Sequence, residues 1–200
     1  MTNKIYFETD EAEDVAGSIR HALRCADLVQ EDCQAWKWGM LALHSALQGA
    51  CVCHLTTNDS PFGAFTKKSA INWVTYHDES RINQDLNHPE TMLLNFPDLL
   101  KAVRKSGSSG GAAKNTPIEI TDAELDWLTR IHSQVRNQFV HFEPSAWSIE
   151  VSGIPHIGRI IARIIKDIHD CGWAFRHMNS TRRNAMVLDL EHLKEATWKS

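Results

Sequence analysis

The segment AWKWGMLALHSALQGACVCHL restricts how this chain can fold more than any other part of the sequence. Its residues favour a helix, and apolar side chains occur around nearly the whole circumference of that helix. A helix with this pattern has to be enclosed by other elements. We therefore expect residues 34–54 to form the central helix. Its polar positions are the notable ones, and His44 and Gln48 stand four residues apart on one face.

Three further segments have the spacing of long amphipathic helices that could surround this one. They cover residues 10–29, 122–142 and 155–172, with apolar side chains recurring at three- and four-residue intervals. The second of them starts with Thr121 followed by Glu124, which is the sequence pattern of a capping box. Four long helices with little sign of strands predict an all-α fold, arranged as an antiparallel four-helix bundle.

The remaining segments are additions to this single domain, which we expect to span residues 1–200. A long insert at 56–117 separates the second and third main helices and contains a short helix near 97–104. Within the insert, residues 106–116 are rich in glycine and serine, so we expect a flexible loop that is dispensable for folding. Residues 180–200 form a C-terminal extension with an extra helix.

Composition and charge exclude several classes of protein. A chain of 200 residues with a net charge of -4 has no broad cationic surface for clamping duplex nucleic acid. Its first residues do not read as a targeting signal, and no run of apolar residues is long enough to span a membrane. Five cysteines, an odd number, do not suggest a disulfide framework, so we expect a reducing, cytoplasmic location.

The pair Cys51 and Cys53, followed by His54, invites interpretation as a metal site. On a helix, however, residues two apart diverge by about 200° and cannot share one ion. Buried small side chains are the better interpretation. We expect neither a metal nor a cofactor.

The motif RNQFVH, from Arg136 to His141, lies at the end of the third predicted helix, shortly before Pro144 breaks it. With about 100° per residue and the apolar stripe at zero, Arg136 lies about 100° away and His141 about 240° away. His141 therefore does not point into the core of its own helix. Asn137, four residues before His141, could hydrogen-bond to the imidazole and select its tautomer.

Two interpretations of this motif remain open on spacing alone. Arg130, Gln134, Asn137 and His141 form a continuous polar stripe, which an ordinary solvated helix would also show. In that case the protein is a helical scaffold. A functional site is the alternative, but Arg136 and His141 are about 140° apart, so they converge on one ligand only if the helix distorts or the arginine side chain swings round.

The motif RNQFVH resembles the signature of the HEPN superfamily (higher eukaryotes and prokaryotes nucleotide-binding domains). That signature is an arginine, a polar residue directly after it and a histidine after four to six intervening residues, late in a helical bundle, and this motif has four. The resemblance implies a four-helix bundle and a metal-independent endoribonuclease of toxin–antitoxin or antiviral type, with a site shared across a homodimer. It implies that His141 is the general acid or base, that Arg136 stabilises the phosphorane and that Asn137 orients a partner or the phosphate. Imidazole and guanidinium suit this chemistry.

The resemblance leaves partners and activity partly open. RNA or a nucleotide is the expected ligand, and an antitoxin protein is a possible partner. Some superfamily members lack nuclease activity, so the alternative function is a non-catalytic nucleotide- or protein-binding module.

Other candidate binding residues depend on the fold. His44 and Gln48 could line the same groove from the second helix, or could be a satisfied buried polar pair. Glu143 follows His141 closely enough to assist it, although a carboxylate in a loop is usually just solvated. Arg159 shares a face of the fourth helix with Arg163 and could add local positive potential, against a default of ordinary surface charge.

Overall fold

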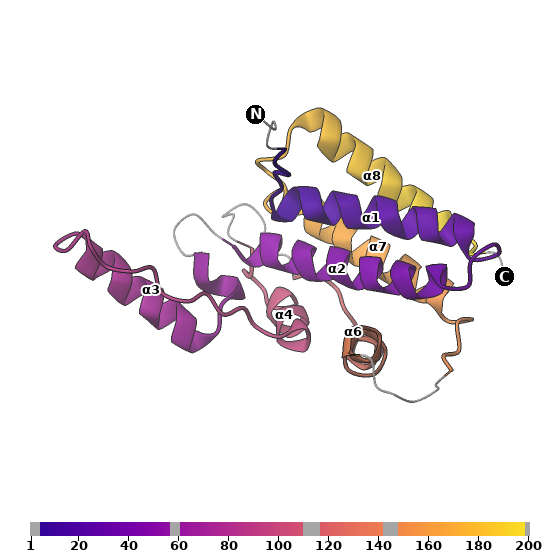
Figure 1. The fold of residues 1–200 in the computed structure, drawn as a ribbon, viewed down its shortest axis with the longest axis horizontal. Coiled ribbons are helices and arrows are strands. Elements are labelled where there is room, and N and C mark those ends of the chain that lie inside the picture. The colour runs from indigo at the N-terminus through magenta and orange to yellow at the C-terminus, as the bar shows by residue number, and fades with distance from the viewer. Residues whose placement is uncertain (1–4, 57–60, 110–116, 142–147, 199–200) are drawn as a thin grey trace.

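The computed structural model is helical throughout, apart from loops and turns (Figure 1). It describes four stretches of the chain, namely residues 5–56, 61–109, 117–141 and 148–198. The described residues contain no β-strand, and one isolated antiparallel bridge joins Phe65 to Leu93. The prediction of an all-α fold is confirmed for this part of the chain. None of its helices is both long and apolar enough to cross a membrane.

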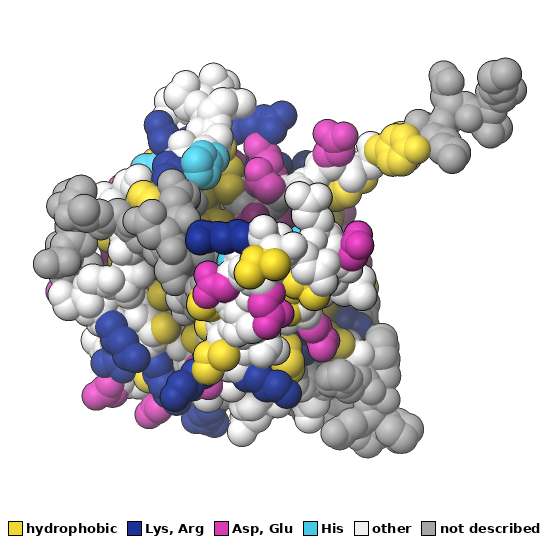
Figure 2. Space-filling model, turned by 90° about the vertical axis from the view of Figure 1, so that its left-hand side faces the viewer, with side chains coloured by type: hydrophobic (Ala, Val, Ile, Leu, Met, Phe, Trp, Pro, Cys, Tyr) yellow, Lys and Arg dark blue, Asp and Glu magenta, His cyan; other side chains and the backbone are white. Residues whose placement is uncertain are grey.

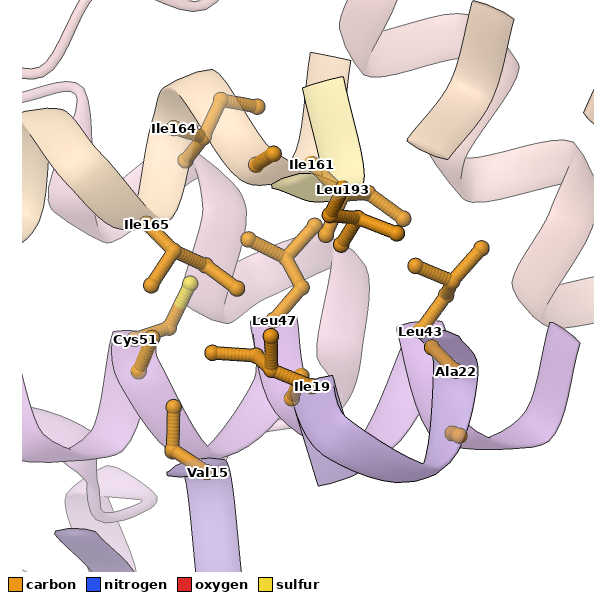
Figure 3. Packing of buried hydrophobic residues seen from close by; sticks show 14 of the residues in the cluster. Val15, Ile19, Ala22, Leu43, Leu47, Cys51, Ile161, Ile164, Ile165 and Leu193 are labelled. Carbon is orange, nitrogen blue, oxygen red and sulfur yellow. The ribbon is translucent and has the colours of Figure 1, made fainter. Parts of the chain in front are cut away.

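Four long helices enclose the core. They are α1 (Glu11–Leu28), α2 (Ala35–Leu55), α7 (Ile154–Asp170) and α8 (Ser180–Glu195). Contacts run from α1 to α2, from α2 to α7, from α7 to α8 and from α8 back to α1. Figure 3 shows apolar side chains from all four helices meeting in the core, among them Val15, Ile19, Leu43, Leu47, Ile161, Ile165 and Leu193.

The central position predicted for α2 is confirmed. This helix contacts α1, α4 and α7, and its buried residues are distributed along its whole length. Cys51 and Cys53 are buried free thiols, and burial raises the pKa of both, that of Cys53 to about 12. They pack as small apolar side chains, as the sequence suggested.

Side-chain caps define where two of these helical segments begin. Asp10 caps α1, because its carboxylate accepts the Glu13 backbone N–H at 2.8 Å. The predicted capping box is present: Thr121 Oγ1 accepts the Glu124 N–H at 3.2 Å, and the Glu124 carboxylate accepts the Thr121 N–H at 2.9 Å. Both caps satisfy backbone donors that the first helical turn leaves without an intrahelical partner.

The segment expected as the third bundle helix differs from the prediction in shape and in position. It consists of α5 (Asp122–Arg130), a π-helical turn η2 (Ile131–Arg136) and α6 (Asn137–His141). Figure 1 shows it running across α2 rather than alongside it, and it contacts α2 through η2. The C-terminal extension supplies the fourth long helix instead, because α8 packs against both α1 and α7.

The insert contains a 3-10 turn η1 (Pro61–Ala64), α3 (Lys67–Ser80) and α4 (Phe96–Val103). The short helix predicted near 97–104 is α4, which packs against α2 with one apolar face. By contrast, α3 protrudes from the other helices, and its one buried residue is Ser69 (Figure 1). Figure 2 looks at this end of the molecule and shows acidic, basic and apolar side chains interspersed.

The loop expected at 106–116 is described only as far as Ser109. Within that part, Ser108 is held in place by two hydrogen bonds. Its hydroxyl donates to the Val103 carbonyl at 3.0 Å and lies 2.9 Å from Nε2 of His54, which is fully buried. The start of the loop is therefore attached to α2. Residues 110–116 lie outside the described part.

Candidate functional site

A groove of about 740 Å³ lies between the start of α1, the middle of α2 and the end of the η2–α6 segment. Helix α2 contributes the largest share of its lining, and it contacts both of the other elements that border the groove, α1 and η2. The described lining residues are Thr9, Asp10, Glu11, Asp14, Leu41, His44, Ser45, Gln48, Gly49, Val52, Leu93, Arg136 and Val140.

The groove brings together three of the residues that the sequence singled out, Arg136, His44 and Gln48. They come from segments about ninety residues apart in the chain, and they meet because η2 crosses α2. The backbone of His141 ends α6, but its side chain lies outside the described part of the structure, and so does all of Glu143. Arg159 is exposed on α7 and is not among the described lining residues.

Asn137 holds the guanidinium of Arg136. Nη1 of Arg136 donates to Oδ1 of Asn137 at 3.1 Å, and both side chains are partly buried. Because the amide oxygen accepts one of five guanidinium donors, the others remain for backbone, solvent or an anion. The sequence suggested a different bond for Asn137, to the imidazole of His141, and that bond concerns a side chain outside the described part.

The π-helical turn is the local feature that sequence reasoning missed. Its i→i+5 bonding adds a residue to the turn and changes which side chains lie above one another. The hydroxyl of Ser133 donates back to the Thr129 carbonyl at 3.0 Å, a type of side-chain bond that competes with regular helix geometry. On this turn His132 and Arg136 lie close enough for the arginine charge to affect the histidine. Short π segments of this kind often occur at functional sites.

His132 meets His44 across the η2–α2 contact. Nε2 of His44 and Nδ1 of His132 are 2.9 Å apart, and the ring planes are inclined by 18°. Phe96 of α4 contacts both rings, with centroid distances of 4.4 Å to His44 and 5.4 Å to His132. The insert thus supports the site through α4. The spacing of His132, four residues before Arg136, was the one signal in the sequence that could have identified it.

Burial and a nearby cation keep this histidine pair neutral. Burial, then His132, then Arg136 lower the pKa of His44 to about 3, and burial followed by Arg136 lowers the pKa of His132. At neutral pH the 2.9 Å contact therefore holds one proton, donated by one ring nitrogen and accepted by the other. The tautomers of the two rings are therefore coupled, because only one of the two facing nitrogens carries the proton.

The α1 side of the groove is acidic. Asp10, Glu11 and Asp14 line it, whereas Arg136 is the one Lys or Arg among the described lining residues. Oδ2 of Asp14 accepts a hydrogen bond from Ser45 at 3.4 Å. The groove therefore combines one strong anion-binding group with several acceptors for hydroxyl or amino groups.

The arginines of α7 serve different purposes. Arg163 donates to Glu124 at 2.9 Å, to Asp167 at 3.0 Å and to the Glu119 carbonyl at 2.7 Å, so it joins α7 to the start of α5. Arg159 remains exposed. Within the described stretches, no three His, Cys, Asp or Glu side chains are arranged so that they could hold a metal ion.

Comparison of the chain with known protein families, with curated proteins and with solved structures finds no match.

Proposed function

We propose that the groove is the active site of a metal-independent endoribonuclease of toxin or defence type, resembling the HEPN superfamily. The observation that supports this proposal is the guanidinium of Arg136, held by Asn137 at 3.1 Å and facing a groove that also contains His44. Arginine binds phosphate oxygens through paired hydrogen bonds, and histidine exchanges protons near neutral pH. Phosphodiester cleavage needs both functions.

In this mechanism the 2′-hydroxyl of a ribose attacks the adjacent phosphorus. A new bond forms between O2′ and phosphorus, the bond from phosphorus to O5′ breaks, and a 2′,3′-cyclic phosphate results. Arg136 stabilises the additional negative charge on the phosphorane, and His141 transfers a proton as general acid or base. Gln48 lines the groove and can hydrogen-bond to a base or a sugar.

The proposal includes a site shared by two copies of the chain. At the regular helical period of about 100° per residue, Arg136 at the end of η2 and His141 at the end of α6 are about 140° apart, so one copy is expected to converge poorly on one phosphate. A twofold axis beside α6 would bring the arginine of one protomer close to the histidine of its partner. Val140 of α6 is 42% exposed and lines the groove, so α6 has an accessible apolar side chain that a second copy could cover.

A second candidate is a non-catalytic HEPN-like module that binds a nucleotide or a protein partner. The acidic side of the groove favours it, because Asp10, Glu11 and Asp14 oppose the approach of a polyanion such as RNA. A partner with hydrogen-bond donors or positive charge would meet no such repulsion.

Cleavage of a mixed RNA substrate in excess chelator separates the two candidates. We expect wild-type protein to cleave, and Arg136→Ala and His141→Ala each to lose at least about 10²-fold in rate with unchanged melting temperature. Arg130→Ala is the matched control, since Arg130 is exposed on the same segment and is not among the lining residues. Inactive wild-type protein would favour the binding module, and a protein that is monomeric at assay concentration would contradict the shared site.

A further inference from the structure

Cleavage through a 2′,3′-cyclic phosphate requires two proton transfers. One group must take the proton from the 2′-hydroxyl, and another must give a proton to the leaving O5′. Under the proposed function His141 performs one of these steps, and the other has no assigned residue. Among the described side chains that line the groove, the one imidazole is that of His44.

His44 has the surroundings of an oriented base. Its Nε2 atom is engaged with Nδ1 of His132 at 2.9 Å, and Phe96 packs against both rings. Among the described residues Nδ1 of His44 has no hydrogen-bond partner. An imidazole with one nitrogen anchored and the other free is the arrangement in which a base is held by a third group.

We propose that His44 is the second proton-transfer residue of this site, and that His132 is the positioning residue that fixes its ring and tautomer. The proposal rests on the proposed function. When Nε2–H of His44 donates to Nδ1 of His132, the lone pair of His44 Nδ1 is available to accept a proton. After accepting it, the His44 imidazolium keeps the same hydrogen bond to His132.

The charges around His44 make this transfer depend on the substrate. Arg136 disfavours the imidazolium, and a phosphate bound to Arg136 offsets that charge, so phosphate binding raises the pKa of His44. Phe96 of α4 is uncharged and adds only burial. The titratable groups near His44 are His132 and Arg136 from η2 and Asp10, Glu11 and Asp14 from α1. The three carboxylates line the same groove but are not among the causes of the lowered pKa of His44.

The proton-transfer step balances without any other reactant. The proton of the 2′-hydroxyl passes to Nδ1 of His44 while O2′ bonds to phosphorus. As the bond from phosphorus to O5′ breaks, a proton from His141 passes to O5′. Hydrolysis of the cyclic phosphate by water runs the two transfers in reverse and restores both histidines.

The test uses substitutions that imitate one ring nitrogen at a time. His44→Gln places an amide near the former Nε2, so it keeps the contact with His132 but has no proton acceptor at the Nδ1 position. His132→Asn imitates Nδ1 of His132 and keeps the support of His44, whereas His132→Ala removes it. Cleavage of RNA, binding of a 2′-deoxy oligonucleotide that cannot be cleaved, and melting temperature are measured for each variant, with Arg136→Ala alongside.

We expect His44→Gln to lower kcat by about 10²-fold or more. Its affinity for the 2′-deoxy oligonucleotide and its melting temperature should stay at the wild-type values. His132→Ala should lower kcat, and His132→Asn should restore most of it, which a purely space-filling role would not produce.

Three outcomes would overturn the inference. Wild-type kcat in His44→Gln, with Arg136→Ala inactive, would overturn it and leave the proposed function intact. Loss of oligonucleotide binding and of thermal stability in His44→Gln would show that His44 is structural. Wild-type protein without cleavage activity would overturn both proposals together.

Discussion

Helix α2 carries two buried histidines whose surroundings are similar in most respects. His44 and His54 are 6% and 0% exposed, each has one hydrogen bond of 2.9 Å, and burial is the largest cause of a lowered pKa in both. At the His54 end the partner is Ser108, a neutral hydroxyl from the insert. At the His44 end the partner is a second histidine, with Arg136 nearby and a groove alongside.

The difference between His44 and His54 shows that a lowered pKa caused by burial alone does not indicate a functional histidine. Burial alone lowers the pKa of His54, and the Nδ1 atom of this residue is enclosed without a hydrogen-bond partner in the described structure, so no ligand can reach it. Burial also lowers the pKa of His44, but His132 and Arg136 from another segment lower it as well. An anion bound to Arg136 would offset the effect of its charge. A perturbed pKa points to function only when it is combined with access and a charged partner.

Truncation of His54 should give the largest effect on stability. His54→Ala removes a fully buried ring and leaves Ser108 with less support, and we expect a loss of about 2–4 kcal/mol in the free energy of unfolding. Urea denaturation measures it, with the exposed His177→Ala as control. The RNA cleavage proposed for the groove should be unchanged in the folded fraction. Reduced cleavage at full folding would mean that the two ends of α2 are coupled.

Acid should destabilise the protein through both histidines. The pKa of His54 is about 4 in the folded protein against 6.5 for the free side chain, so the unfolded chain binds the proton more readily between these values. Stability is therefore complete above pH 6.5, and the His54 share, about 3 kcal/mol, is lost as the pH falls to about 4. His44 acts in the same direction.

Denaturation at a series of pH values isolates the His54 share. His54→Gln keeps a donor for Ser108 but cannot titrate, so it should lose about 3 kcal/mol less than wild type between pH 7 and 4. Identical slopes in the two proteins would show that other groups cause the acid sensitivity.

A smaller loss of stability is expected when the hydrogen bond between His54 and Ser108 is removed by changing Ser108. Ser108→Ala leaves the buried N–H of His54 without its acceptor and should lower the free energy of unfolding by about 1–2 kcal/mol. Replacing residues 110–116 with a short linker keeps Ser108 and, from their glycine-rich composition, should leave the melting temperature nearly unchanged. If the protein kept its stability when Ser108 was deleted together with residues 110–116, the distinction between Ser108 and those residues would be contradicted.

Substitution of Arg159 should have the smallest effect on stability and on the proposed cleavage. It is exposed on α7, outside the described lining of the groove, so Arg159→Ala should change stability by less than about 0.5 kcal/mol and leave cleavage at the wild-type rate. Slower cleavage in this variant, in otherwise folded protein, would extend the site to α7 and support a role for Arg159 in binding.

Much of the helical structure was predictable from local features of the sequence. Capping side chains act within one turn, which is why the starts of α1 and α5 could be predicted from Asp10 and Thr121. The enclosure of α2 followed from its apolar circumference. The partners of each helix were harder to predict, because an apolar stripe does not specify which neighbour covers it, and α8 took the place expected for residues 122–142.

The candidate site was predictable only in part. Arg136, His44 and Gln48 were identified as polar positions on or beside apolar helices, and they do line one groove. His132 was missed because its importance depends on a π-helical turn, and a regular period of about 100° per residue does not include such a turn. The acidic side of the groove was missed because its carboxylates are far from the motif in sequence and lie at the capped start of another helix.

The sequence by itself determined the helical class, the helix starts and the central position of α2. It also determined the presence of an arginine and polar residues near the end of the segment 122–141. These features depend on local bonding and on apolar periodicity. Tertiary structure alone decided that η2 crosses α2, that His132 pairs with His44 at 2.9 Å and that Asp14 faces the same groove as Arg136. The physical reason is that helix crossing depends on how side chains from distant segments fit together.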